Sequence, residues 1–408
     1  MVAGPRVLFY CHDSYGLGHV RRTLTLSRCL HERRPGASQL LVTGSPLAHR
    51  LVPEDDIEYV KLPSVLKCGQ DDYRARLLPL DPNGITSLRS ELIAAATRHF
   101  TPDVVVVDHA PAGMNGEILP PLEALRKSRP QTRFVLGLRD VVDDAERVRE
   151  AWTRDGVYGL LDDLYDRILV YGEETVFDVV RGYAFPAGAA RKTRYVGYLG
   201  RPPARPADQV RAELGLRTGR LVLVTAGGGG DGYTVLRTYL DALRYDPRAA
   251  DGFDSLLVTG PLMPQEERKE LEALVPGGLP VRVVDFVDDG MSTVTSADAV
   301  VSMGGYNSIA EIMSAARPAV VIPRIAPRTE QLIRAERLSR RGLIRLLHPD
   351  ELSPRRLLDE VKGLLAGRVG PMWPVSLEGT TAAVQELEAL LPDADAADAQ
   401  ELRLVEAR

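Results

Sequence analysis

The sequence predicts an α/β protein built from two doubly wound, Rossmann-like domains that face a central cleft. Short apolar runs rich in β-branched residues alternate with segments of helical periodicity along most of the chain. This alternation is typical of parallel sheets covered by helices on both faces. Glycine-rich turns follow strand-like runs in both halves, and the length of 408 residues exceeds that of one ordinary domain.

Composition indicates a globular enzyme-like protein, with 44% hydrophobic and 26% charged residues. The net charge of −5 argues against a nucleic-acid partner. Cys11, Cys29 and Cys68 form neither a disulfide framework nor a metal-binding spacing, which favours a reducing compartment. We expect a cytoplasmic location, because the chain opens directly into a strand and no apolar run approaches the ~18 residues of a membrane span.

The first half contains strand-like runs separated by helical patterns. These runs are RVLFYC (6–11), LLVTG (40–44), IEYVKLP (57–63), PDVVVVDHAP (102–111), TRFVLGLRD (132–140) and RILVYGEE (167–174). A turn with Gly16, Gly18 and His19 follows the first run and leads into a helix. His19 is therefore expected at the carboxyl edge of the first strand, where an imidazole can act as a general base or bind a phosphate. A surface histidine near a helix start is the plainer alternative.

Polar residues end several of these strands, where they can contact an acceptor substrate: Asp108-His109, Arg139-Asp140 and Glu173-Glu174. Asp108 and His109 follow an unbroken run of valines, so we expect them at the lip of the sheet in contact with an acceptor substrate. A solvated charge or a helix cap is the alternative for each residue alone. The segment 68–85 shows little periodicity and is predicted to be a long loop that helps to recognise the acceptor.

A proline- and arginine-rich stretch at 194–208 predicts a semi-rigid linker, with the domain boundary close to Gly200. We therefore assign 1–199 to an acceptor-side domain and 200–392 to a second domain. The acidic, alanine-rich segment 393–408 is predicted to be a disordered tail.

The second half repeats the strand and helix pattern. Its strand-like runs are LVLVTA (221–226), SLLVTGP (255–261), VRVVDF (281–286), ADAVVSM (297–303), AVVIPRI (319–325) and LIRLLHP (343–349). The glycine loop 227–232 lies between a strand and a helix, as a phosphate-binding loop does. It lacks the GK[ST] of a Walker A motif and is not a dinucleotide fingerprint. The run of four glycines predicts a close approach of the backbone to a ligand.

A second glycine turn, Gly304-Gly305, opens another helix whose bare amides suit a phosphate. The alternative is that Ser308 and Glu311, at S-x-x-E spacing, form a capping box and need no ligand. Glu330 and Gln331 begin a further helix after the next strand, again at an edge where α/β proteins collect ligands.

Together, the FVDD of 286–289, the glycine turn with its S-x-x-E helix, and the EQ pair resemble the C-terminal half of MurG-like GT-B glycosyltransferases. The resemblance covers most of the chain but is more specific in the second half. It implies a domain that binds a UDP-sugar, with the backbone of Val287 on the uracil and Glu311 on the ribose. The implied contacts to the diphosphate and then to the sugar hydroxyls are Gly228, Gly229, Gly305 and Ser308, followed by Glu330 and Gln331.

The resemblance also implies that His19 lies near the reacting centre. Arg334 stands where the family usually has an asparagine, and we expect it to alter sugar choice or to add positive charge near the diphosphate.

The expected activity is an inverting, metal-independent glycosyltransferase that uses no cofactor besides its NDP-sugar, a UDP-hexose or UDP-N-acetylhexosamine. The acceptor is a hydroxyl on a small or lipid-linked molecule, with His19 or Asp108 as the base. The sequence contains no D-x-D metal motif beside the donor site. A UDP-sugar hydrolase or epimerase of the same build, and a non-enzymatic nucleotide-sugar binder, are the alternatives. Arg21-Arg22 and Arg33-Arg34 are candidates for peripheral membrane contact, although solvated helix charges explain them as well.

Overall fold

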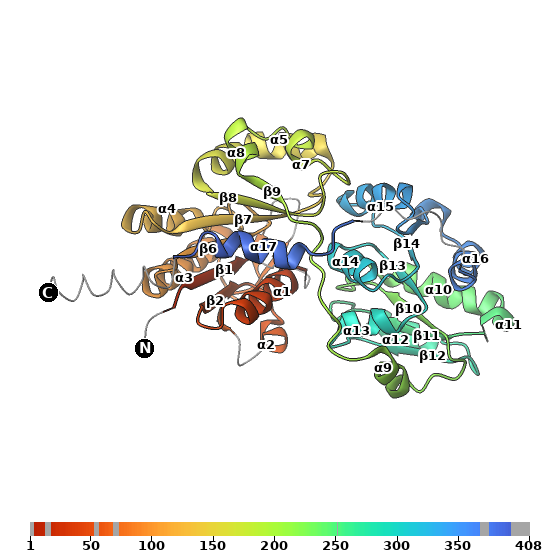
Figure 1. The fold of residues 1–408 in the computed structure, drawn as a ribbon. Helices are drawn as coiled ribbons and strands as arrows, with labels where there is room; N and C mark the ends of the chain where they lie inside the picture. Colours follow the sequence, from red (N-terminus) through yellow and green to blue (C-terminus); the bar gives the residue numbers. More distant parts are fainter. Residues whose placement is uncertain are drawn as a thin grey trace.

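The computed structural model describes residues 4–12, 18–52, 57–67, 73–250, 252–367 and 375–392. The chain forms two domains, each a parallel sheet covered by helices (Figure 1). The strands of the first sheet run in the order β3-β2-β1-β6-β7-β8-β9. Their bounds are β1 Arg6–Cys11, β2 Ser38–Thr43, β3 Glu58–Lys61, β6 Val104–Asp108, β7 Arg133–Arg139, β8 Arg167–Tyr171 and β9 Thr193–Tyr195.

Helices on both faces of this sheet bury its apolar strands, as the fully buried run 104–108 in the central β6 shows. These helices are α1 Gly18–Arg33, α2 Ala48–Leu51, α3 Pro82–Phe100, α4 Leu119–Ser128, α5 Ala145–Arg154, α6 Val157–Gly159, α7 Val179–Gly182 and α8 Ala187–Lys192, with a π-helical turn at Leu160–Leu164. Local chemistry fixes the start of α3, because Pro82 opens the helix and the Asp81 carboxylate accepts from the Gly84 amide at 2.6 Å.

The second sheet has the order β12-β11-β10-β13-β14-β15, and its paired strands are also parallel. Its strands are β10 Leu221–Thr225, β11 Asp254–Val258, β12 Val281–Val284, β13 Ala299–Ser302, β14 Ala319–Val321 and β15 Arg345–Leu346. The helices that follow the linker are α9 Ala207–Leu214, α10 Tyr233–Tyr245, α11 Pro247–Ala250, α12 Gln265–Ala273, α13 Gly290–Ser296, α14 Tyr306–Ser314, α15 Glu330–Arg340, α16 Pro354–Leu365 and α17 Gly379–Glu388, with a 3₁₀ turn at Pro349–Glu351.

The strand order reverses beside β1 in the first sheet and beside β10 in the second. In open α/β sheets, ligands bind outside the carboxyl ends of the strands at such reversal points. The helices that leave these points, α1 and α14, pack against each other across the domain boundary. The Asn307 amide donates to the carbonyl of Gly18 at 3.1 Å. The two expected binding edges therefore face one another.

A packed interface joins the domains. One apolar cluster runs from the first sheet through Tyr198 and Tyr306 into the second. The rings of Tyr198 and Tyr306 stack with centroids 6.0 Å apart, and the Tyr306 hydroxyl accepts from the Leu199 amide at 3.1 Å. The first sheet ends at β9 and the second begins at β10, on either side of Gly200.

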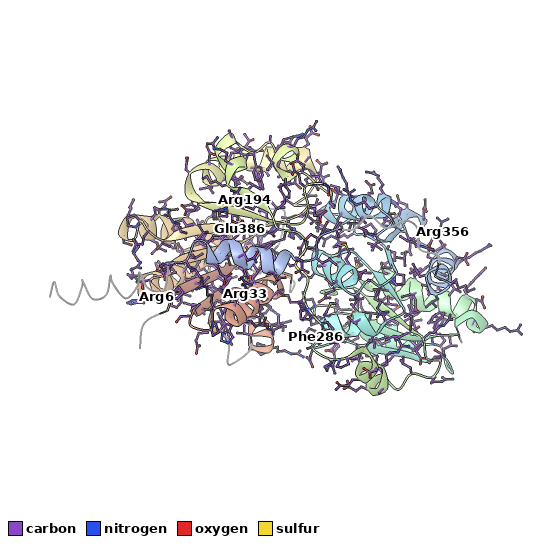
Figure 2. The ribbon with its side chains drawn as sticks, in the orientation of Figure 1. Arg6, Arg33, Arg194, Phe286, Arg356 and Glu386 are labelled. Atoms are coloured by element: carbon purple, nitrogen blue, oxygen red, sulfur yellow. The ribbon has the colours of Figure 1, made fainter. Side chains whose placement is uncertain are left out.

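The position of the C-terminal helix differs from our expectation that residues 200–392 form one domain. Helix α17 returns to the first domain and packs against α1 (Figure 1). Its buried face contains Ala383, Val384 and Leu387, while Glu388 pairs with Arg33 at 2.6 Å. Figure 2 labels Arg33 on α1 and Glu386 on α17. The predicted tail 393–408 lies outside the described residues.

Part of the segment 68–85, which we expected to be a long loop, forms a strand and the start of a helix. Strands β4 Val65–Lys67 and β5 Tyr73–Ala75 form an antiparallel pair that flanks residues outside the described ranges. Helix α3 already begins at Pro82. Among the described residues, no helix has the length and apolar character needed to cross a bilayer.

Candidate functional site

A histidine–aspartate pair lies at the carboxyl edge of the first sheet. His19, in the first turn of α1, places Nδ1 2.6 Å from Oδ2 of Asp108, the last residue of β6. Arg22, one helical turn further on, donates to both carboxylate oxygens at 3.2 and 2.7 Å. Burial alone would raise the pKa of Asp108, but Arg22 and the hydrogen bond from His19 outweigh it and hold that pKa well below its usual value.

The ionised Asp108 favours one tautomer of His19. Nδ1 lies 2.6 Å from Oδ2 of Asp108 and 2.9 Å from Nη2 of Arg22. The contact with the carboxylate is the shorter of the two, and it becomes a hydrogen bond when Nδ1 carries the hydrogen. Nε2 of a neutral His19 is then the basic nitrogen, which is the arrangement of a general base oriented by an acid. The side chain of His19 remains 17% exposed, so a substrate hydroxyl can reach it.

Two further histidines lie beside His19. The ring centroids of His12 and His109 lie 4.7 and 5.3 Å from that of His19. Burial, followed by the charge of Arg139, lowers the pKa of His109 well below its ordinary value. Burial, followed by His19, does the same for the pKa of His12. Both rings are therefore neutral near pH 7.

Glu330 approaches the first domain from the opposite side of the cleft. Its side chain is buried at the start of α15 and pairs with Arg324 at 2.7 Å. Burial would raise the pKa of Glu330, but the guanidinium groups of Arg139 and Arg324 lower it. Gln331, its predicted companion, accepts from the Arg324 amide at 2.9 Å through its side-chain oxygen. That bond occupies one of the polar atoms that we expected to contact a sugar.

The start of α14 has no capping box. The N-cap residue is Gly305 and no side chain caps the helix, so Ser308 lies inside the first turn and Glu311 in the second. The alternative interpretation of these two residues is therefore wrong: the S-x-x-E spacing falls three positions too late in the helix. The amides of this first turn are left available to a ligand.

The glycine loop after β10 packs tightly against the loop after β11. A Cβ on Gly229 would lie 2.2 Å from the carbonyl oxygen of Thr259, and a Cβ on Gly260 would lie 2.5 Å from the carbonyl carbon of Gly228. These two glycines serve backbone contact within the protein. Gly227, with φ +63 and no atom within 4 Å of an added Cβ, is the glycine of this loop that faces open space.

A pocket lies between this loop and α14. Gly227 and Gly260 border one side of it, and Ser308 and Glu311 border the other. Val287 lies at one wall beside the ring of Phe286, which Figure 2 labels at the face of the second domain that is turned towards the first. Three predicted donor-site residues, Val287, Ser308 and Glu311, are thus brought together, whereas neither Gly228 nor Gly229 lines this pocket.

An adjoining pocket between the domains is rich in arginine. Arg21 and Arg50 place their guanidinium groups 5.4 and 5.0 Å from the ring centroid of Phe286. Arg201, from the linker, pairs with Glu311 at 2.8 Å. Arg21 and Arg50 have no acidic partner within ion-pair distance in the described part of the chain. Their positive charge suits an anionic ligand.

The structure thus places the predicted residues in two groups that face each other. The first domain contributes His19, Asp108 and His109, and the second contributes Val287, Ser308 and Glu311, with Glu330 between the groups. Gly18 begins α1, and Gly16 lies outside the described residues. Sequence reasoning weighed Arg21 and Arg22 only as surface charges, and it considered Arg139 as one of several polar strand ends without choosing it as a site residue. Only the three-residue spacing of Arg22 from His19 on one helix hinted at its role.

Comparison with known proteins shows similarity to glycosyltransferases. Residues 234–369 match the glycosyltransferase family 28 C-terminal domain. An uncharacterized glycosyltransferase of Methanopyrus kandleri is 29% identical over 165 residues, or 40% of this chain and 44% of the relative. A UDP-N-acetylglucosamine–N-acetylmuramyl-(pentapeptide) pyrophosphoryl-undecaprenol N-acetylglucosamine transferase of Corynebacterium efficiens is 26% identical, and the match spans 42% of its length. The first of these relatives are thus matched over less than half of their length.

Longer matches extend the similarity to the whole chain. The transferase of the same name from Paenarthrobacter aurescens is 26% identical over 361 residues, which is 86% of each chain. MurG of Acinetobacter baumannii superimposes with a TM-score of 0.55 at 14% identity, covering 94% of this chain and 99% of that one. A ugt transferase from Siraitia grosvenorii in complex with UDP gives a TM-score of 0.58 at 15% identity, covering 93% and 94%. The fold is the GT-B fold.

Proposed function

We propose that this MurG-like chain, a GT-B fold with a family 28 C-terminal domain, transfers a sugar from a nucleoside diphosphate sugar to a hydroxyl acceptor with inversion. One observation carries the proposal. The His19–Asp108 pair faces, across the domain boundary, an uncapped helix start and a pocket that contains Glu311. A base and an anion site on opposite walls of one cleft are what transfer from a diphosphate requires.

The donor occupies the pocket beside α14 in this proposal. Its diphosphate accepts from the first amides of α14, while Glu311 accepts from the ribose hydroxyls and Val287 borders the base. The names of several relatives specify UDP-N-acetylglucosamine, which supports a UDP-hexose or UDP-N-acetylhexosamine here. Ligand binding must first displace Arg201 from Glu311, and the released guanidinium can then approach the diphosphate.

The reaction follows from the positions of the groups. The acceptor oxygen attacks the anomeric carbon while its proton passes to Nε2 of His19. The bond from the anomeric carbon to the diphosphate oxygen breaks, and its electron pair leaves with the nucleotide. Attack on the face opposite to the leaving group inverts the anomeric centre. Helix amides and arginines stabilise the developing charge, so we propose that turnover persists in EDTA.

The first experiment is thermal stabilisation by nucleoside diphosphates and their sugars. Bound at about 100 times its dissociation constant, a ligand adds about 2.7 kcal/mol of stability. We expect UDP to stabilise the wild type and Glu272→Ala, an exposed residue on α12, but not Glu311→Ala. If no nucleotide raises the melting temperature, the donor site proposed here does not exist.

A nucleotide-sugar hydrolase is the second candidate, because the same base can activate water. The 17% exposure of the His19 side chain leaves solvent access to this site. Release of free sugar in buffer, at a rate that added acceptor alcohols do not change, would favour the hydrolase. Formation of a glycoside at the expense of free sugar would favour the transferase.

A further inference from the structure

Two buried hydrogen-bond donors at the edge of the first sheet have no acceptor among the residues that the structure describes. One is Nε of Arg139, the last residue of β7, and the other is a ring nitrogen of His109, which follows β6. The Arg139 Nη2 donates to Nε2 of His109 at 3.0 Å. A guanidinium is always a donor, so Nε2 must be the acceptor and Nδ1 of His109 must carry the hydrogen. Nδ1 is the ring atom that lacks a partner.

The charge of Arg139 has no ion-pair partner at close range in the described part of the chain, although the charge of Glu330 acts on it from further away. The carboxylate of its neighbour Asp140 forms an ion pair with Arg334 at 2.7 Å, and the carboxylate of Glu330, across the cleft, forms an ion pair with Arg324 at 2.7 Å. Within the described ranges, no carboxylate lies within 4.0 Å of the Arg139 guanidinium. Burial, which outweighs the nearby charge of Glu330, lowers the pKa of Arg139 to about 10, and the charges of Arg22, Arg334 and Arg328 contribute to this shift. The half-buried guanidinium of Arg139 is therefore only partly neutralised in the described structure.

The backbone at His109 is also held in an uncommon conformation. Its φ is +68°, in the left-handed region that histidine seldom adopts. The amide of His109 donates to the Gly137 carbonyl at 2.7 Å, which fixes this turn against β7. Residues kept in such conformations concentrate at ligand-binding sites. The turn presents the imidazole beside Arg139.

We propose that Arg139 and His109 form a subsite for an anionic group, a carboxylate or phosphate, carried by a substrate in the cleft. The anion accepts hydrogen bonds from Nε–H of Arg139 and Nδ1–H of His109. The chemistry requires an anion, because a neutral hydroxyl would satisfy the hydrogen bonds but leave the charge of Arg139 unneutralised. The inference rests on the proposed function only for the identity of the molecule that carries the anion, either the donor sugar or the acceptor.

The test uses the full chain with Arg139→Gln, and with Arg191→Gln as a matched control on the exposed surface of α8. Calorimetry compares UDP-glucuronate with UDP-glucose, which detects an anion on the donor sugar. A second titration adds inorganic phosphate to protein saturated with UDP, which detects an anion on the acceptor side. We expect Arg139→Gln to weaken one of the anionic probes about tenfold or more, the effect of one charge-assisted hydrogen bond.

The controls separate this inference from its premise. UDP alone should bind Arg139→Gln and Arg191→Gln as it binds the wild type. The melting temperature of free Arg139→Gln should change little, because the substitution removes one hydrogen bond to His109 but no ion pair. If UDP binds but neither anionic probe responds to Arg139→Gln, the subsite is refuted and the donor site stands. If UDP does not bind, the donor site falls, and phosphate on the free protein still tests Arg139. Should Arg139→Gln fail to fold, Arg139→Lys keeps the charge but not the Nε donor, and it should bind the probe with intermediate affinity.

Discussion

Arg334 on α15 of the second domain donates hydrogen bonds to both carboxylate oxygens of Asp140, which follows β7 of the first domain, at 2.7 to 3.0 Å. Neither side chain has any exposed surface. The Tyr198 hydroxyl also donates to Asp140 at 3.1 Å, and Arg334 reaches the Gly304 carbonyl at 3.3 Å. Arg334 therefore ties the domains together, and its charge is paired with Asp140.

We predict that Asp140→Asn lowers the free energy of unfolding by about 3–5 kcal/mol, because it leaves the Arg334 charge buried without its partner. Urea denaturation measures the change. The double variant Asp140→Leu/Arg334→Met removes both charges and should recover much of the loss. If the double variant is no more stable than Asp140→Asn, the two residues do not act as a pair.

His19→Ala should reduce the rate of transfer by about 10²–10⁴-fold, the usual contribution of a positioned general base. UDP affinity should stay within about twofold of the wild type, because His19 lies on the acceptor side of the cleft. His99→Ala, an exposed histidine at the end of α3, is the control. Single-turnover kinetics separates the chemical step from binding. Loss of UDP binding together with activity would argue for a structural role of His19.

Asp108 should make stability depend on pH in the acid range. Its folded pKa is held below the value of about 3.9 in an unfolded chain. The stabilisation is therefore complete above that value and is lost as the pH falls from there towards the folded pKa. Asp108→Asn should be less stable at neutral pH and should show a shallower decline below about pH 4. Melting curves in a buffer series test this, and identical slopes in both proteins would contradict it.

Gly304 and Gly305 offer a matched pair of substitutions. Gly304 has φ +75, and an added Cβ would lie 2.6 Å from Cγ1 of Val321, so Gly304→Ala should destabilise the protein by about 1–3 kcal/mol. Gly305 has no atom within 4 Å of an added Cβ, and its φ is −57. Gly305→Ala should therefore leave the melting temperature unchanged but weaken UDP binding, because its methyl group occupies the space in front of the α14 amides. Unchanged UDP affinity in Gly305→Ala would place the diphosphate elsewhere.

The sequence predicted the fold well, and the site in part, for identifiable reasons. Buried parallel strands leave continuous apolar runs such as the valines of 104–107, so the principal strands were found close to their observed positions. The GT-B fold that the resemblance implied is confirmed. The β4–β5 pair was missed, since its strands span only three residues each. The contact of Arg334 with Asp140 joins residues 194 positions apart, and no local pattern records such a pairing.

The position of α17 was not predictable for a related reason. An amphipathic helix shows in its sequence that it has an apolar face, but not which domain covers that face. The roles of the donor-site residues remain predictions that the experiments above test. The arginines of the cleft were overlooked as a group because their charges come from separate segments, around 21, 50, 139 and 201, that only the folded chain brings near the two domain edges.

The return of α17 to the first domain has a mechanical consequence, because the chain crosses between the domains twice. The outgoing and returning chain segments run side by side. The Tyr198 amide donates a hydrogen bond to the Ser376 carbonyl at 2.9 Å, and the Gly379 amide donates one to the Tyr198 carbonyl at 3.1 Å. Leu199 and Glu378 form an antiparallel bridge between them. Such a double crossing resists torsion and lateral sliding far better than a single tether does. We therefore expect any opening of the cleft to be a rotation about one axis through Tyr198, and each closure to return His19 to the same position opposite α14.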